Sequence, residues 1–512
     1  MPRDTAMARR SSGLAARRGR PGRHYRVPAL LGATALGAVL LGALLPGRAT
    51  PARQAAILAA QDPTASVTVN AGAGLAPVPS GAIGLNTAVF DGDMTDPAIP
   101  GLLKAAGIDA LRYPGGSYAD IFNWSANTAA GGFDAPNTAF DTNFIPLAQS
   151  ISAQPIVTAN YGTGTPDLAA AWVEDANVAH HDGIKYWEVG NEVYGNGFYG
   201  TQWEQDDHAS KSPDTYAANF LQFRSAMQAV DPGIKVCAVL TTPGFWPDGV
   251  VGPGDTMDWN HTVLSILGSN VDCVVVHYYP GGSDSASTLQ DPSGIPGIMS
   301  TLRSEISQYA GSSASSVQVL VTETNSTLDL DTQPGALFTA DTFATWLENG
   351  AVNVDYWDEH NGIGTPAAVD GQTDDNDQGM FSNGSSGSGV TEPPADTPFA
   401  PYYGLEMLTK FVSAGDTPVT SGSDQPLVAV HAVKRADGDL DVLLINKDPG
   451  NSYTVSLSYD GFTPSPAAPA VFTLANNATS ITSAQQGTAA SQTIGPYSLT
   501  VIQLTPSSTA TQ

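Results

Sequence analysis

Basic residues, cysteine and long apolar runs are all scarce in this chain of 512 residues. It has 21 lysines and arginines against 49 acidic residues, two cysteines, and one long apolar run near the N-terminus. A single run of that kind excludes a multi-span membrane protein. The 53 glycines and 37 prolines stay below the fraction typical of disordered or collagen-like chains. Composition therefore favours a soluble globular protein.

The few basic residues are unevenly placed. Ten of the 21 lie in the first 53 positions, where Asp4 is the single acid, so the remainder carries 11 basic against 48 acidic residues. A body that acidic repels phosphate backbones and anionic lipid surfaces. We therefore expect no nucleic-acid partner and no membrane contact by the folded part, and neutral substrates fit better.

The N-terminal segment is typical of an export signal. Its arginines precede the apolar run 27–45, and small residues near Ala49 and Ala60 are candidate cleavage sites. We expect residues 1–60 to be a leader and linker, and the protein to be secreted or extracellular. Because the run is long for a cleaved signal, an uncleaved signal-anchor at the cell surface stays open.

The two cysteines lie in apolar, strand-like runs. Cys237 falls in 234–240 and Cys273 in 272–278, which suits buried thiols as well as a bridge between neighbouring strands, and we favour packed thiols. The eight histidines are scattered, and no Cys/His spacing resembles a metal site. We expect no metal and no cofactor.

Strand-like runs alternate with helical patterns, such as 166–180 and 213–230, over some three hundred residues. The alternative to a barrel, a doubly wound sheet, lacks a glycine-rich phosphate loop after its first strand. Eight strand–helix pairs predict a (β/α)8 TIM barrel, of class α/β. The eight candidate strands are 82–86, 110–113, 155–160, 185–191, 234–240, 272–279, 317–324 and 352–357.

Three further segments complete the predicted organisation. The barrel spans 81–415 and contains a long loop, 361–399, rich in glycine, aspartate, serine and proline. Short alternating runs separated by turn residues predict a C-terminal all-β sandwich domain over 416–512. Residues 61–80 contain a strand that we expect to join this sandwich.

Two glutamates end strands of the predicted barrel. Glu192 closes the fourth strand and Glu323 lies near the end of the seventh, where TIM barrels place their chemistry. Either glutamate alone fits a solvated loop, but on strands three apart they face each other across the mouth. Paired carboxylates there perform glycoside hydrolysis: one, with a raised pKa, protonates the leaving oxygen, and the other attacks the anomeric carbon.

The sequence around Glu192, WEVGNE at 187–192, resembles the acid/base motif of clan A retaining glycoside hydrolases. LRYPGG at 111–116, NYGTGT at 160–165, WVE at 172–174 and KYW at 185–187 resemble, in order and spacing, family 51 α-L-arabinofuranosidases. The resemblance covers roughly residues 80–360. It implies a retaining enzyme with a carbohydrate substrate, which the leader predicts to be secreted, and it leaves the oligomeric state open.

The resemblance also implies roles for single residues. Glu192 would be the acid/base and Glu323 the nucleophile, while Asn191 would hold the sugar's 2-hydroxyl. Arg112 would hydrogen-bond the nucleophile and keep its pKa low. The alternative for Arg112 is a structural salt bridge below the site.

Four more residues are candidates for substrate binding. His277 and Tyr279, in VHYY at 276–279, match a His-x-Tyr pair whose tyrosine touches the nucleophile, with Tyr278 turned into the wall. Trp357 ends the eighth strand, where such hydrolases place an aromatic floor, although a lone tryptophan is as often core. Asn86 ends the first strand.

Two departures from family 51 concern sugar recognition. The nucleophile lies in TETN at 322–325 in place of an Asp-Glu-Trp context, and Asn86 stands where the family has a glutamate. The retaining mechanism is therefore better supported than arabinose as the substrate.

Several alternative functions stay open. They are β-glucuronidase, β-xylosidase and endo-glycanase activities, a non-catalytic carbohydrate-binding protein, and a tethered cell-surface structural protein. The anionic surface argues against uronic-acid substrates.

Overall fold

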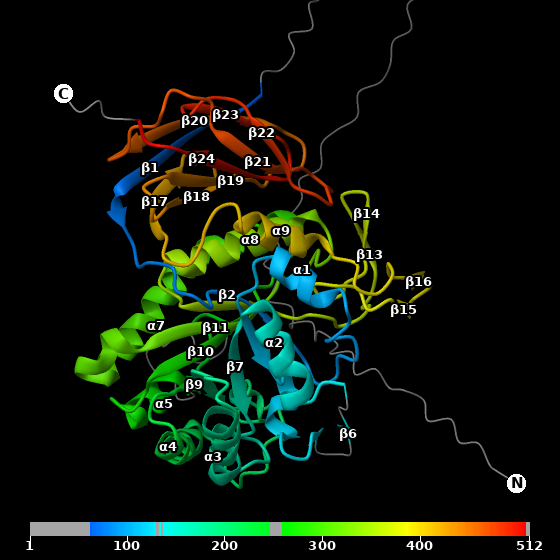
Figure 1. Ribbon diagram of the computed structural model, residues 1–512, viewed down its shortest axis with the longest axis vertical. Coiled ribbons are helices and arrows are strands. Elements are labelled where there is room, and N and C mark those ends of the chain that lie inside the picture. Colours follow the sequence, from blue (N-terminus) through cyan, green and yellow to red (C-terminus); the bar gives the residue numbers. More distant parts are fainter. Residues whose placement is uncertain (1–61, 130–132, 135–136, 246–258, 508–512) are drawn as a thin grey trace, which may run out of the picture. The chain divides into compact units, whose positions relative to one another are not determined.

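The computed structural model describes residues 62–129, 133–134, 137–245 and 259–507 (Figure 1). The predicted leader, residues 1–60, lies outside these described residues. Within them, no helix is both long enough and apolar enough to cross a membrane.

Eight parallel strands close into a barrel in the order β10-β11-β12-β2-β3-β7-β8-β9. Each of the eight predicted segments contains one of them to within a residue, which confirms the (β/α)8 barrel. Their residues are almost all buried, because a parallel barrel is covered by helices outside and filled by side chains inside. The strands are β2 (Ile83–Asn86), β3 (Ala110–Tyr113), β7 (Gln154–Ala159), β8 (Tyr186–Val189), β9 (Lys235–Val239), β10 (Cys273–Tyr278), β11 (Gln318–Thr324) and β12 (Asn353–Tyr356).

Helices follow the barrel strands, and α3 and α4 each begin with a side-chain N-cap. The hydroxyl of Thr165 accepts from the Leu168 amide at the start of α3, and Ser212 accepts from the Thr215 amide at the start of α4. The helix predicted over 166–180 changes to π-helical geometry at Glu174. The helices are α1 (Ile99–Ala105), α2 (Ile145–Ile151), α3 (Pro166–Val173), α4 (Pro213–Val230), α5 (Trp259–Leu267), α6 (Ser285–Thr288), α7 (Ile295–Ala310), α8 (Gln333–Glu348) and α9 (Ala400–Leu408).

The two cysteines form a disulfide, so our preference for packed thiols is wrong. Strands β9 and β10 are parallel neighbours, and their register sets Cys237 directly opposite Cys273. The two Cα atoms lie 4.4 Å apart, and the sulfurs are bonded. The sequence placed both residues on strands but contained no information on the register, which decides between the two states.

The C-terminal strands form a nine-stranded sheet in the order β22-β21-β24-β19-β18-β17-β1-β20-β23. The N-terminal strand β1 (Thr64–Gly74) pairs with β17 and β20, and appears in blue among orange and red strands in Figure 1. The others are β17 (Thr417–Ser423), β18 (Val428–Lys434), β19 (Leu440–Asn446), β20 (Tyr453–Asp460), β21 (Ala470–Leu474), β22 (Thr482–Gln485), β23 (Ser491–Ile494) and β24 (Ser498–Leu504).

Strand β19 connects two hydrophobic cores. Leu440, Val442 and Leu444 point into the core of the sandwich, which β1, β20 and β24 also line. The alternate residues Leu443 and Ile445 belong to the core that the sheet shares with the barrel. Because successive side chains of a strand point to opposite faces, a strand between two cores has apolar residues on both faces, as the run 442–445 of β19 does.

The predicted loop 361–399 contains two short hairpins. They pair β13 (Ala367–Val369) with β14 (Gln372–Asp374) and β15 (Ser386–Gly387) with β16 (Val390–Thr391). The amide of Asn325 donates to the carbonyl of Gln378, which ties this loop to the end of β11.

A buried charge cluster joins the barrel to the sandwich. Asp341 of α8 pairs through one oxygen with Nε2 of His431 on β18 at 2.8 Å and through the other with Nζ of Lys447 at 2.5 Å. Nδ1 of His431 lies 3.0 Å from Glu348. Burial opposes charge on His431, but Glu348 and Asp341 outweigh it and raise the pKa of His431 to about 10. Burial likewise opposes charge on Asp341, but Lys447 and His431 hold the pKa of Asp341 well below its usual range.

This cluster makes stability depend on pH. A raised histidine pKa stabilises the fold fully below the unfolded value of about 6.5 and is lost as pH rises toward about 10. The lowered Asp341 pKa stabilises it above about pH 4, so both contributions coincide from about pH 4 to 6.5. We expect His431→Gln to cost about 3 kcal/mol at pH 5.5 and much less at pH 10. Urea unfolding at both pH values measures this, and equal costs would contradict it.

Candidate active site

Glu192 and Glu323 meet at the carboxyl end of the barrel. Glu323 lies on β11, and Glu192 follows β8 after Gly190. One carboxylate oxygen of each glutamate and one nitrogen of His277 all lie within 4.8 Å of one another. Both the backbone of Glu192 (φ 37°) and that of Gly190 (φ 82°) are left-handed, which turns the chain sharply after the strand and directs the Glu192 side chain to the mouth.

Three donors surround the carboxylate of Glu323, which is 5% exposed. Nη1 of Arg112 donates at 2.8 Å and the Tyr279 hydroxyl at 2.7 Å, while Nδ1 of His277 lies at 3.3 Å. Burial nevertheless raises the pKa of Glu323 above its ordinary value, against the lowering effects of His277 and Arg112. Our expectation that Arg112 would leave this pKa low is therefore wrong, because removal from water outweighs the nearby cation.

Three other contacts hold Glu192. Nδ1 of His277 lies 2.9 Å from one oxygen, the Tyr194 hydroxyl donates to the same oxygen at 3.2 Å, and Nε1 of Trp203 donates to the other at 2.6 Å. Burial alone would raise the pKa of Glu192, but these contacts, led by His277, lower it. We expected a raised pKa for the acid, so this direction is a second correction. His277 thus lies between both glutamates, with Nδ1 2.9 Å from Glu192 and 3.3 Å from Glu323.

Arg112 uses all five of its N–H groups at the base of the site. Nε and Nη2 donate to Glu188 at 3.1 and 2.8 Å, Nη1 donates to Asn86 and Glu323, and Nη2 also donates to Asn191 at 2.9 Å. Arg112 and Glu188 are both fully buried. Arg112 therefore makes both of the contacts considered for it, a hydrogen bond to Glu323 and a buried salt bridge to Glu188.

Removing the Arg112 guanidinium is expected to damage both the fold and the site. In Arg112→Gln, Glu188 and Glu323 lose their buried cation, so we expect a stability loss of about 3–5 kcal/mol. Arg112→Lys keeps the charge, and we expect a smaller stability loss with activity still reduced, because three donors cannot replace five. Urea unfolding of both variants tests this. Wild-type stability of Arg112→Gln would contradict it.

The amides of Asn86 and Asn191 are largely occupied by protein groups. Asn86 donates to the carbonyls of Thr322 and Tyr356 and accepts from Arg112, so its contacts orient Arg112. Asn191 accepts from Arg112 and donates to Glu204 at 3.0 Å.

Tyr278 is the last residue of β10, and Trp357 follows the last residue of β12. Trp357 is 9% exposed and packs over Gly116, where a Cβ atom would lie 2.5 Å from the indole ring. The second glycine of LRYPGG, at φ 51°, thus makes room for the tryptophan. The Tyr278 hydroxyl donates to the carbonyl of Asp291, away from the glutamates.

Four further residues of the site were not predicted from the sequence: Glu188, Tyr194, Trp203 and Glu204. Glu188 had a usable signal, because a charged residue in the middle of an apolar barrel strand requires a buried partner. Trp203 had none, because it lies in an irregular segment eleven positions after Glu192, and only the fold brings the two together.

Sequence comparison finds relatives over part of the chain, and no family model matches it. A probable α-L-arabinofuranosidase C of Aspergillus fumigatus is 29% identical over 228 residues, which is 37% of this chain and 41% of the relative. An intracellular exo-α-L-arabinofuranosidase of Bacteroides ovatus is 25% identical over 205 residues, which is 35% of this chain and 36% of the relative. The chain thus matches less than half the length of these curated relatives.

Solved structures match over most of the chain. An α-L-arabinofuranosidase from Thermotoga maritima in complex with arabinose has a TM-score of 0.67 at 18% identity, covering 86% of this chain and 99% of its own. A family 44 xyloglucanase of Paenibacillus polymyxa has a TM-score of 0.62 at 14% identity, covering 86% and 100%.

The fold and the site define a class: a (β/α)8 barrel with a C-terminal sandwich and two glutamates at the barrel's mouth. Within that class, the chain resembles the clan A glycoside hydrolases, and among them family 51.

Proposed function

We propose that the protein is a retaining glycoside hydrolase that acts as an α-L-arabinofuranosidase. The observation that carries the proposal is the approach of Glu192 and Glu323, whose nearest carboxylate oxygens lie within 4.8 Å. Retaining enzymes need carboxyl groups about 5–5.5 Å apart, whereas inverting enzymes leave about 6.5–9.5 Å for a water molecule. A purely binding protein would not require two carboxylates, one buried and one half-buried, at this separation.

The proposed reaction has two steps. Glu323 attacks the anomeric carbon and forms a glycosyl ester while Glu192 gives its proton to the departing oxygen. Glu192 then removes a proton from water, which attacks the same carbon, releases the sugar with retained configuration and frees Glu323. Arg112 and Tyr279 hold the attacking carboxylate in place through both oxygens. His277, Asn191 and Trp357 would contact the sugar.

The sugar assignment rests on the relatives, whose names state α-L-arabinofuranosidase activity. Asn86 weakens the assignment of arabinose, because family 51 has a substrate-binding glutamate at this position. Both N–H groups of the Asn86 side chain donate to backbone carbonyls. A change in sugar specificity within the same mechanism is therefore the second candidate, with β-xylosidase, β-glucuronidase or endo-glycanase activity.

We also propose that the protein is exported. The arginine-rich leader with its apolar run supports this, and so does the Cys237–Cys273 disulfide, since such bonds persist in oxidising compartments. N-terminal sequencing of protein from culture medium tests the proposal. A chain found only in the cytosol would contradict it, and a chain retained at the membrane with its leader intact would favour the signal-anchor.

A substrate panel tests the sugar assignment. The purified protein is incubated with aryl α-L-arabinofuranoside, β-D-xyloside, β-D-glucuronide and β-D-glucoside, and with arabinoxylan and β-glucan. We expect release from the arabinofuranoside. Release from another member alone would correct the sugar and keep the mechanism, and no release from folded protein on any member would contradict the proposed function.

A further inference from the structure

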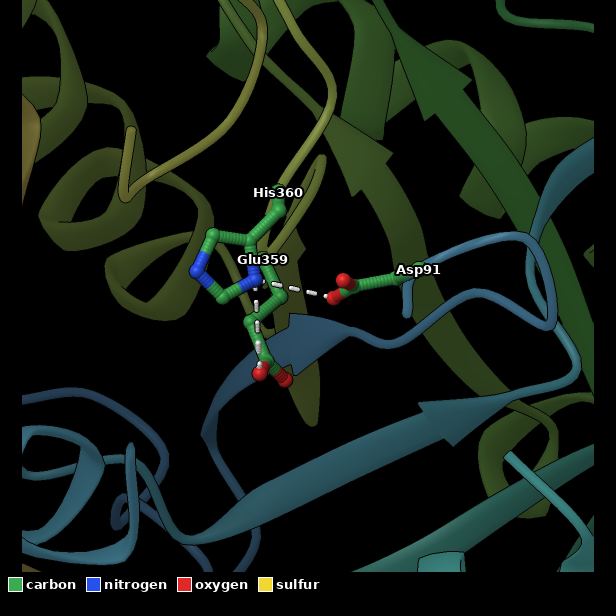
Figure 2. A group of neighbouring side chains, drawn as sticks. All are labelled: Asp91, Glu359 and His360. Carbon is green, nitrogen blue, oxygen red and sulfur yellow. Dashed lines mark hydrogen bonds and ion pairs between the residues drawn. The ribbon is translucent and has the colours of Figure 1, made fainter. Parts of the chain in front are cut away.

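A second group of buried ionisable side chains lies apart from the two glutamates. It consists of Asp91 in the loop after β2, and of Glu359 and His360 in the segment after β12 (Figure 2). These residues are 4%, 0% and 2% exposed. Since β2 and β12 are hydrogen-bonded neighbours in the barrel, the group bridges the chain segments that follow its first and last strands.

The three side chains converge on one point. Nδ1 of His360 lies 2.9 Å from Asp91 Oδ2 and 3.7 Å from Glu359 Oε1, and Figure 2 shows both carboxylates facing the same ring nitrogen. One donor atom from each residue lies within 4.8 Å of the other two. Atoms bound to one metal ion at about 2.0–2.2 Å fall within this range of each other.

Glu359 carries the strongest indication of a missing ligand. It is fully buried, yet neither of its carboxylate oxygens accepts a hydrogen bond from the described residues. A buried carboxylate without donors is costly unless a cation or a proton compensates it. Burial, and after it the negative charges of Asp91, Asp358 and Asp396, raise the pKa of Glu359 well above its ordinary value.

The second nitrogen of His360 lies near a carboxylate, although it makes no hydrogen bond among the described residues. Nε2 lies 3.4 Å from Oδ1 of Asp396. Histidines that bind metal through one nitrogen typically donate the other N–H to a carboxylate, which fixes the ring orientation.

We propose that Asp91, Glu359 and His360 bind one divalent ion of the first transition series, with Mn²⁺ and Zn²⁺ as the matching probes. Two carboxylates and one imidazole are hard-to-borderline donors that suit these ions, whereas Ca²⁺ takes six to eight oxygens. The ion joins the loop after β2 to the segment after β12, so its effect is on stability. The proposal does not depend on the proposed function.

The alternative is a proton on Glu359, with His360 charged between Asp91 and Asp396. Glu359→Gln separates the two states, because a neutral amide of the same shape mimics the protonated acid but is a poor metal ligand. Asp91→Asn is the second variant and keeps the shape of the other carboxylate. A less buried cluster that also combines two carboxylates with one imidazole, Asp141, Asp175 and His180, provides the matched control His180→Ala.

The experiment uses the full chain, stripped with a chelator and titrated with Mn²⁺ or Zn²⁺ by calorimetry, with thermal unfolding as a second readout. We expect one equivalent to bind and, at about 100 times the Kd, Tm to rise by about 3 °C. Glu359→Gln and Asp91→Asn should weaken binding at least tenfold, and His180→Ala should leave it unchanged. Absence of stoichiometric binding, binding unaffected by Glu359→Gln, or selective binding of Ca²⁺ would overturn the proposal.

Discussion

Replacing Glu323 with alanine is expected to lower kcat by roughly 10⁴-fold or more on every substrate, which is about 5 kcal/mol of transition-state stabilisation. The reason is that Glu323 is the proposed nucleophile, and Arg112 and Tyr279 both donate to its carboxylate. The loss should not depend on the leaving group, because neither step proceeds without the nucleophile.

Two controls accompany this prediction: the Glu323→Ala variant must be shown to fold, and a glutamate far from the site is replaced in the same way. Arg112 keeps its buried partner Glu188 in the variant, so Glu323→Ala is expected to fold. Glu174→Ala, at an exposed position on the outer helical layer, should retain wild-type turnover. Initial rates on the active aryl glycoside, with circular dichroism of each variant, measure both. A folded Glu323→Ala protein with a tenth of normal turnover would contradict the role of Glu323.

Replacing Glu192 with alanine is expected to have an effect that depends on the leaving group. With a poor leaving group, such as a sugar hydroxyl in arabinoxylan, loss of the proton donor should lower kcat/KM by roughly 10²–10⁴-fold. With a dinitrophenyl leaving group, which departs without a proton, the first step should be nearly unaffected. The second step lacks its base, so kcat should fall and a fast initial burst of dinitrophenol should precede slow turnover.

Comparing the two substrates measures this dependence. A wild-type value of kcat/KM on the dinitrophenyl glycoside beside a large loss on the polymer supports Glu192 as the acid/base. Equal and small losses on both would remove Glu192 from the proposed mechanism and, with it, the assignment of the pair.

The barrel was predictable because its strands carry a strong local pattern. Short runs rich in valine, isoleucine and leucine, such as 272–279 and 317–324, reflect burial on both faces of a parallel sheet. Strands β22 and β23 carry no such pattern, because TSAQ and SQTI have little apolar content and pair only through tertiary context.

The residues of the site that lie at strand ends could be predicted from the sequence. Glu192, Glu323, Arg112 and Tyr279 were found from their positions at strand ends and from the motifs around them, and the structure brings all four together. The pKa directions of the two glutamates were not predictable, because burial and the donors His277 and Trp203 decide them.

Contacts between segments far apart in the sequence could not be predicted. Asp91, Glu359 and His360 come together across 269 positions, and no local spacing indicated that they would. The Cys237–Cys273 bond likewise depends on strand register, which a local pattern does not contain.

The most direct test of the account is mass spectrometry of the covalent intermediate. Glu192→Ala protein is mixed with the dinitrophenyl glycoside of the active sugar, quenched within the burst, digested and mapped. We expect one added glycosyl group, carried by the peptide that contains Glu323 and bonded to that residue. Turnover without any labelled peptide, or a label on a different residue, would contradict a retaining mechanism in which Glu323 is the nucleophile.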